Sequence, residues 1–132
     1  MRLWHKDLIP VLPRQQLLGQ WRECCLITKS IAEKGTPNHI LVNRIMDYPM
    51  DHFYSFCYNV KVEMIQRKYQ IKSQIKDPWY YVRCNDLFKN WHNDIYLRQC
   101  LYNLEEKYIC GGISNEEWQR ICAKFPEYEL CS

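Results

Sequence analysis

The sequence predicts an all-α protein, organised as a compact single-domain helical bundle over residues 1–132. Apolar residues recur at steps of three and four between proline and glycine punctuation, which is the period of amphipathic helices. A length of 132 residues is enough for one hydrophobic core and short for two ordinary domains. Four glycines, six prolines and 14% aromatic residues exclude collagen, low-complexity disorder and a coiled-coil rod.

The first two helices are predicted over residues 13–34 and 38–46. Proline suits the first turn of the longer helix, and Gly35 suits the position after its last turn. Steps of three and four residues define its buried face, which comprises Leu17, Trp21, Cys24, Cys25, Ile31 and Ala32.

Three more helices are predicted in the rest of the chain. Asp51 is the expected N-cap of a helix over residues 52–68. A helix over residues 93–110 stops at two consecutive glycines, and a capping box at residues 114–117 opens a last helix that runs to residue 124. Residues 72–91 are expected to be irregular, with residues 79–82 forming either a strand or a packed loop.

Composition narrows the cellular setting and the partners. The net charge of +3, from 18 basic and 15 acidic residues, permits a nucleic-acid partner without requiring one. If DNA is the partner, the positive charge must gather on one face. The chain has no apolar run of roughly 20 residues and no apolar h-region at its start. We therefore expect a cytoplasmic monomer with neither a membrane span nor a signal peptide.

The eight cysteines are expected to be mainly small buried hydrophobic side chains. None of them has C-x-x-C spacing, and the four histidines have no metal-binding spacing either. A cytosolic chain also offers no oxidising compartment for a disulfide framework. We therefore predict no metal site.

The helix over residues 13–34 carries a second feature opposite its apolar stripe. Gln16, Gly19, Gln20 and Glu23 lie along one ridge, with Arg22 at its edge. A glycine inside a helix costs roughly 1 kcal/mol against alanine, so the space it leaves could admit a ligand or another backbone beside Glu23. A solvated helix face with a glycine at a helix crossing explains the same pattern.

The sequence around this ridge resembles a known family. Residues 14–23, Arg-Gln-Gln-Leu-Leu-Gly-Gln-Trp-Arg-Glu, following Arg2-Leu3, resemble the amino-terminal helix of the pyrimidine-dimer DNA glycosylases, the endonuclease V family of phage. A bacterial branch that begins Met-Arg-Leu-Trp-His is similar over a longer stretch. The chain departs from the family pattern in having Gln16 in place of a histidine and Leu26 in place of an arginine.

The resemblance implies a glycosylase with AP-lyase activity that needs no metal or cofactor. Its α-amine would attack C1′ of the damaged nucleotide and form an imine, and Glu23 would assist. Large Arg2 disfavours removal of Met1, so Met1 is the implied nucleophile. An ordinary α-amine has a pKa near 7.7–8.0 and is roughly 10–15% free base at pH 7, far more than a lysine.

Double-stranded damaged DNA is the implied partner. The predicted contacts are Arg2, Arg14, Gln16 and Arg22, with Lys6 as a further phosphate contact, and Trp4 and Trp118 are candidates for a stacking wedge. Trp21, on the apolar stripe, is expected in the core. Two alternatives stay open: activity on another lesion or on abasic sites alone, and a non-catalytic helical module that binds nucleic acid or protein.

Overall fold

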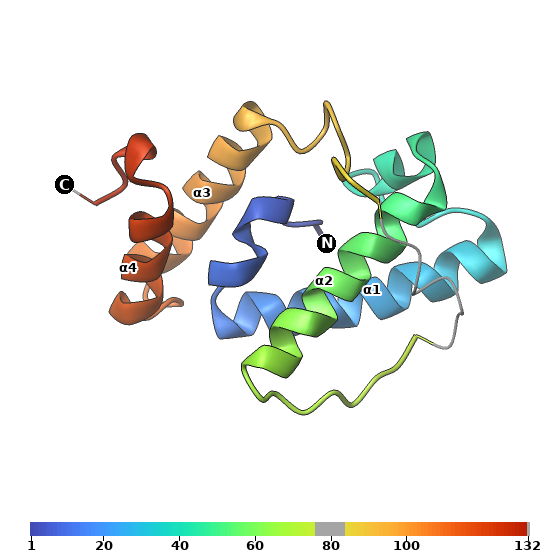
Figure 1. Cartoon of the computed structure of the whole chain (residues 1–132), viewed down its shortest axis with the longest axis horizontal. Helices are drawn as coiled ribbons and strands as arrows, with labels where there is room; N and C mark the ends of the chain where they lie inside the picture. The colour runs from blue at the N-terminus through green and yellow to red at the C-terminus, as the bar shows by residue number, and fades with distance from the viewer. Residues whose placement is uncertain (76–83, 132) are drawn as a thin grey trace.

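The helices form two groups on either side of the amino-terminal segment. The structure is a computed structural model that describes residues 1–75 and 84–131. The predicted strand or loop at residues 79–82 lies outside this range. In chain order the elements are η1 (Lys6–Val11), α1 (Arg14–Lys34), η2 (Asn43–Asp47), α2 (Met50–Gln66), α3 (Asp94–Ile109), α4 (Asn115–Lys124) and η4 (Pro126–Tyr128), as Figure 1 shows. All of the regular elements within the described residues are helical, which confirms the all-α prediction.

α1 and α2 pack against each other on one side of η1, and α3 and α4 pack together on the other (Figure 1). α1 ends at Gly35, whose φ of 74° provides the left-handed conformation of a helix C-cap. α3 begins at Asn93, which accepts a hydrogen bond from Tyr96 N–H. α4 begins with the predicted capping box between Ser114 and Glu117. These local signals explain why α1, α3 and α4 lie close to their expected positions, and α2 also lies close to its expected range.

Two side chains, one from each group of helices, hold the residues that link the 3-10 helix η1 to α1. Arg67, at the end of α2, donates to the carbonyl of Leu12 at 2.8 Å and pairs with Glu63 at 2.7 Å. On the other side, the Glu117 carboxylate of α4 accepts the backbone N–H of Arg14 at 2.7 Å. A carboxylate at the start of α1 also complements the positive end of the helix dipole.

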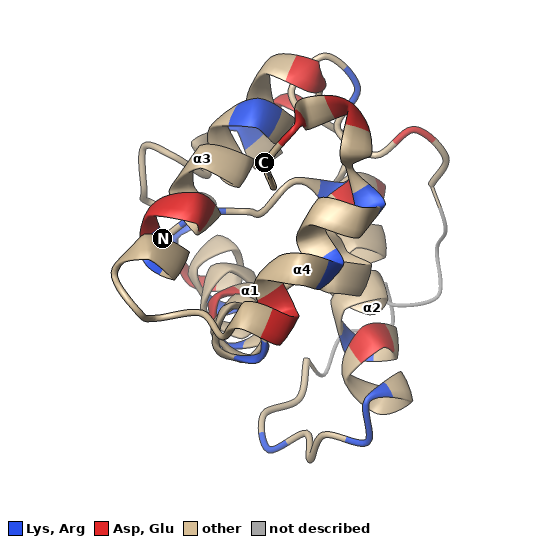
Figure 2. Cartoon of the chain, turned by 90° about the vertical axis from the view of Figure 1, so that its left-hand side faces the viewer, with Lys and Arg blue, Asp and Glu red and all other residues tan. Residues whose placement is uncertain are grey.

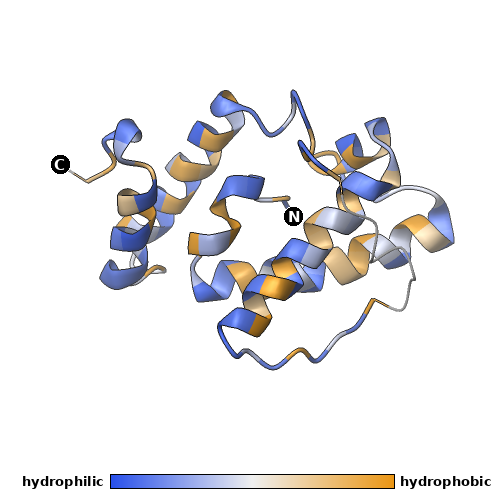
Figure 3. Cartoon of the chain, viewed as in Figure 1, coloured by the Kyte–Doolittle hydropathy of each residue, from blue (hydrophilic) through white to orange (hydrophobic). Residues whose placement is uncertain are grey.

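A hydrophobic core joins the two groups. Each helix carries both apolar and polar residues, as the hydropathy colouring of Figure 3 shows. The apolar side of α1 packs Leu17, Trp21 and Ile27 into this core, and the amino-terminal segment adds Leu3 and Leu8. Burial of Leu3 and Leu8 anchors the amino-terminal segment in the fold, and this restricts the position of Met1.

Two expectations about helices were wrong. Residues 38–46 do not form an α-helix, because Asn38 has a φ of 58° and the Asn43 Oδ1 accepts the His39 N–H at 3.0 Å. Such side-chain hydrogen bonds compete with the helix backbone, and only the 3-10 helix η2 forms. Asp51 is not the N-cap of α2. It lies in the first turn of this helix, and the N-cap residue is Pro49.

The cysteine prediction was wrong in one respect. Cys122 on α4 forms a disulfide with Cys131, because η4 turns the chain back and brings the two Cα atoms to 5.9 Å. Cys24, Cys57 and Cys100 are buried, as expected, whereas Cys110 is exposed.

The described part of the chain contains no group of three or more His, Cys, Asp or Glu residues arranged to hold a metal ion. Over the same residues, none of the helices is both long and apolar enough to cross a membrane.

Candidate active site

The amino-terminal segment lies beside the middle of α1. Backbone N–H of Trp4 donates to Gln20 Oε1 at 2.7 Å, and Gln20 Nε2 donates to the carbonyl of Arg2 at 3.0 Å. Leu3 and Trp4 are buried, while Met1 is 40% exposed. The first residue therefore lies at the surface, whereas Leu3 and Trp4 are packed in the interior.

Glu23 is the carboxylate next to this chain end. Its Oε2 accepts the backbone N–H of Arg2 at 3.4 Å and lies 3.5 Å from Gln20 Nε2. Successive backbone nitrogens are about 3–4 Å apart, so the Met1 amine lies within about 7 Å of Glu23 Oε2. Both residues are partly exposed. A nucleophilic amine and a proton-accepting carboxylate thus share one region of the surface.

The ridge predicted on α1 divides into a buried and an open part. Gln20 is 1% exposed and faces the amino-terminal segment. Among the described residues, an added Cβ at Gly19 would have only Arg22 Nη2 within 4 Å, at 3.6 Å, so none of the described helices crosses here and the helix surface is open. Gln16 is half-buried, and its Oε1 is shielded from solvent without a hydrogen-bond partner in the described structure.

Arg14 and Arg22 are exposed and share a hollow of about 370 Å³ with Lys72. Trp21 and Tyr69 contribute apolar surface to its walls, and the Arg14 guanidinium lies 4.7 Å from the Tyr69 ring. Positive charge therefore gathers beside the open part of α1. Elsewhere along the described chain, basic and acidic residues are interspersed, as the colouring of Figure 2 shows.

Arg2 is less free than the other predicted phosphate contacts. It is half-buried, with its guanidinium 5.5 Å from the Trp4 ring and Nη1 3.9 Å from Cys100 Sγ. Arg2 also lines a second hollow of about 370 Å³ formed with polar residues of α3: Gln99, Tyr102, Asn103 and Glu106. A contact between Arg2 and DNA would therefore be made on the α3 side of the chain end.

Leu26, where the sequence resemblance would place an arginine, is 57% exposed. The exposed face of α1 therefore carries a large apolar side chain one turn beyond Arg22.

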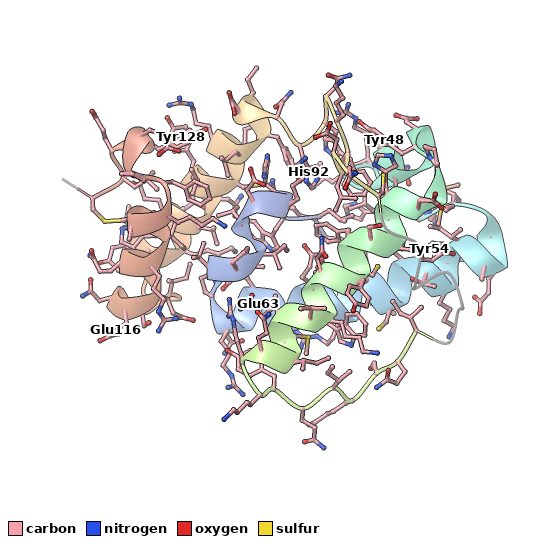
Figure 4. The ribbon with its side chains drawn as sticks, in the orientation of Figure 1. Tyr48, Tyr54, Glu63, His92, Glu116 and Tyr128 are labelled. Carbon is pink, nitrogen blue, oxygen red and sulfur yellow. A yellow bond between two sulfur atoms is a disulfide. The ribbon has the colours of Figure 1, made fainter. Side chains whose placement is uncertain are left out.

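His5 and His92 hold the amino-terminal segment from the α3 side. His92 Nδ1 accepts the backbone N–H of Lys6 at 2.9 Å, and the two imidazole rings stack at 5.1 Å. Figure 4 labels His92 beside this segment. Burial lowers the pKa of His92 to about 2, and burial also lowers that of His5, so both rings are neutral at physiological pH.

The tryptophans proposed as a stacking wedge belong to the core. Trp4 is 7% exposed and Trp118 is 3% exposed, with its indole stacked on Tyr108 at 5.2 Å. Trp21 is buried as predicted, and its indole N–H donates to the carbonyl of Ser73 at 2.9 Å. None of the three is free to enter a DNA duplex without leaving its packing.

Sequence reasoning missed Gln20 and Tyr96 as partners of the chain end. Tyr96 Oη donates to the carbonyl of Leu3 at 2.5 Å. Gln20 was visible on the ridge, but its spacing gives no sign that the amino-terminal segment covers it. Tyr96 carries no signal in the sequence, because its contact joins residues more than ninety positions apart.

Comparison with known proteins links this geometry to a family. A family model described as pyrimidine dimer DNA glycosylase matches residues 1–77, which is more than half of the 132 residues. The matched range includes the amino-terminal segment, α1 and α2. Comparisons with curated proteins and with solved structures gave no match.

Proposed function

The chain belongs to the pyrimidine dimer DNA glycosylase family, and we propose that it excises dimers through an imine formed by the Met1 α-amine with the help of Glu23. One observation carries this proposal: the hydrogen bond from Arg2 N–H to Glu23 Oε2, at 3.4 Å, holds the chain end against the only carboxylate of the α1 ridge. DNA is the substrate that membership of the family implies.

In the first step, the lone pair of the amine forms a bond to C1′ and the bond from C1′ to the base breaks. The base leaves with the electron pair and takes up the proton that the amine nitrogen releases after it bonds to C1′. Opening of the C1′–O4′ bond then gives a protonated imine. The Glu23 carboxylate stabilises the positive charge that develops on the sugar, because an anion beside a growing cation lowers the barrier.

In the second step, Glu23 accepts the C2′ proton, and the bond from C3′ to its phosphate oxygen breaks. This β-elimination cuts the strand on the 3′ side and leaves an unsaturated sugar on the enzyme. Water then hydrolyses the imine and restores the amine. All of these proton movements occur at the amine and at one carboxylate, so the reaction needs only groups that the chain end and α1 supply.

Arg14 and Arg22 are proposed as phosphate contacts of the damaged strand. Both are exposed beside the open surface at Gly19, and Lys72 adds a third positive charge to the same hollow. Gln16 and Arg2 are proposed as further DNA contacts, with Arg2 on the α3 side of the chain end. Contacts of this kind hold the duplex in position and do not read its sequence.

Borohydride trapping tests the proposal. The protein should become covalently attached to a duplex with one abasic site, because borohydride reduces the imine to a stable amine. Mass spectrometry should then place the adduct on Met1. A variant with two residues added before Met1 provides the control, since its amine is displaced from Glu23 and should not be trapped.

Two results would contradict the proposal. An adduct on an internal lysine would rule out the α-amine as the nucleophile. Absence of any adduct, with DNA still bound, would favour the non-catalytic binding module. A second duplex, with a cyclobutane pyrimidine dimer in place of the abasic site, separates dimer excision from activity on abasic sites alone.

A further inference from the structure

The side chain of Gln20 joins the chain end to the carboxylate. Its amide accepts from Trp4 N–H at 2.7 Å and donates to the Arg2 carbonyl at 3.0 Å. The same amide nitrogen lies 3.5 Å from Glu23 Oε2. One side chain, 1% exposed, therefore contacts the backbone on both sides of Leu3 and also contacts Glu23.

The hydrogen bonds of the amino-terminal segment follow the alternation of an extended chain. Backbone groups of Arg2 and Trp4 point toward Gln20 on α1, whereas the carbonyl of Leu3, between them, accepts from Tyr96 on α3 at 2.5 Å. Because a shift of one residue would exchange the two sides, this pattern fixes the register of the segment. The position of the first residue follows from that register.

We propose that Gln20 is a positioning residue that sets the Met1 amine at a working distance from Glu23, with Tyr96 as the second point of attachment. The inference rests on the proposed function, because it concerns the same amine. It adds two residues to which the proposed function gives no role. Tyr96 also lies outside the range that the family model matches.

Glutamine is the side chain that this position requires. Its amide places an N–H donor and a carbonyl acceptor in one plane, as a backbone peptide group does, and the side chain is uncharged. Methionine has a similar length but would leave the Arg2 carbonyl and the Trp4 N–H without partners in a buried place. Glutamate would keep an acceptor for Trp4 but would place a second negative charge beside the amine and Glu23.

The experiment uses four variants of the whole chain: Gln20→Met, Gln20→Glu, Tyr96→Phe and, as a matched control, Gln66→Met. Gln66 is an exposed glutamine at the end of α2. The rate of borohydride trapping is measured at saturating abasic DNA over a range of pH, and the affinity for DNA is measured separately. Hydrogen exchange of the Trp4 backbone amide reports on its hydrogen bond to Gln20 without relying on activity.

Gln20→Met should slow trapping by about 10- to 100-fold, since misplacing a reacting group by about 1 Å has an effect of this size. Its affinity for DNA should stay unchanged, and its Trp4 amide should exchange faster. Gln20→Glu should move the trapping profile to higher pH by about one pH unit, because the added carboxylate favours the protonated amine. Tyr96→Phe should give a smaller loss of rate, and Gln66→Met should behave as the parent.

A purely structural role would lower thermal stability without moving the pH profile of Gln20→Glu, and that result would overturn the inference. Parent-like trapping by Gln20→Met would overturn it as well. If Gln20→Met fails to fold, Gln20→Glu and Tyr96→Phe decide the question. If the parent itself forms no adduct on Met1, the proposed function fails together with the inference. If the parent forms that adduct and every variant forms it at the parental rate, the inference alone fails.

Discussion

Replacing Glu23 with glutamine separates the chemical role of the carboxylate from its structural role. Glutamine keeps the length of the side chain, a similar helix propensity and one acceptor oxygen. That oxygen can still accept from Arg2 N–H and from Gln20 Nε2, which lie 3.4 and 3.5 Å from Glu23 Oε2. The substitution removes the charge and the ability to take up a proton.

The expected effect on stability is small. Both hydrogen bonds of Glu23 are long and Glu23 is partly exposed, so weakening them should cost less than about 1 kcal/mol of unfolding free energy. Loss of a general acid–base group, in contrast, lowers rates by roughly two to four orders of magnitude. This corresponds to about 3–5 kcal/mol of transition-state stabilisation. The two effects therefore differ enough to be measured apart.

The assay is single-turnover cleavage of a duplex that contains one pyrimidine dimer, alongside DNA affinity and a thermal melt. Glu33→Gln is the matched control, because Glu33 is an exposed glutamate on the same helix. We expect Glu23→Gln to bind and melt as the parent does while its cleavage rate falls by the factor above. Glu33→Gln should match the parent in all three measurements.

A change in the protonation of the amine cannot produce the expected loss. Removing the Glu23 charge disfavours the protonated amine, so the free amine becomes more abundant. Any such effect raises the rate. Cleavage at the parental rate by a Glu23→Gln protein would therefore refute the assignment of Glu23 as the catalytic carboxylate.

Arg22→Ala and Arg2→Ala should each weaken DNA binding and reduce the salt dependence of the binding constant by about one counterion, and unchanged slopes would place the DNA surface elsewhere. Gly19→Ala should raise the melting temperature, since a helical glycine costs about 1 kcal/mol and the new Cβ has room, but DNA affinity should fall if a strand approaches this surface. Burial alone would raise the pKa of the Glu117 carboxyl, but hydrogen bonds from Arg14 N–H and from Ser114 outweigh it and hold this pKa below its usual range. The stabilisation from Glu117 is therefore present above the pKa that this carboxyl has in the unfolded chain. It is lost as the pH falls through the lower pKa that the carboxyl has in the folded protein. An acid titration monitored by circular dichroism should show Glu117→Gln to be less stable than the parent at neutral pH and to lose less stability in acid.

The sequence by itself determined the helices whose signals are local. Ser114 and Glu117 form the predicted capping box, and Gly35 ends α1 as expected, because each of these signals acts within one turn of helix. Where local signals compete, the prediction failed. At residues 38–46 the side chain of Asn43 accepts the backbone N–H of His39 and an α-helix does not form, and the strength of that competition depends on the neighbouring packing.

The sequence also placed Glu23 on one ridge of α1, since helical spacing alone decides which residues share a face. It did not distinguish Gln20 from its neighbours on that ridge. Only the tertiary structure shows that Leu3 and Trp4 are buried against α1, and that Gln20 and Tyr96 hold the chain end from opposite sides. The reason is physical: these contacts join residues far apart in the chain, and packing of the whole core, not any local pattern, decides which distant groups meet.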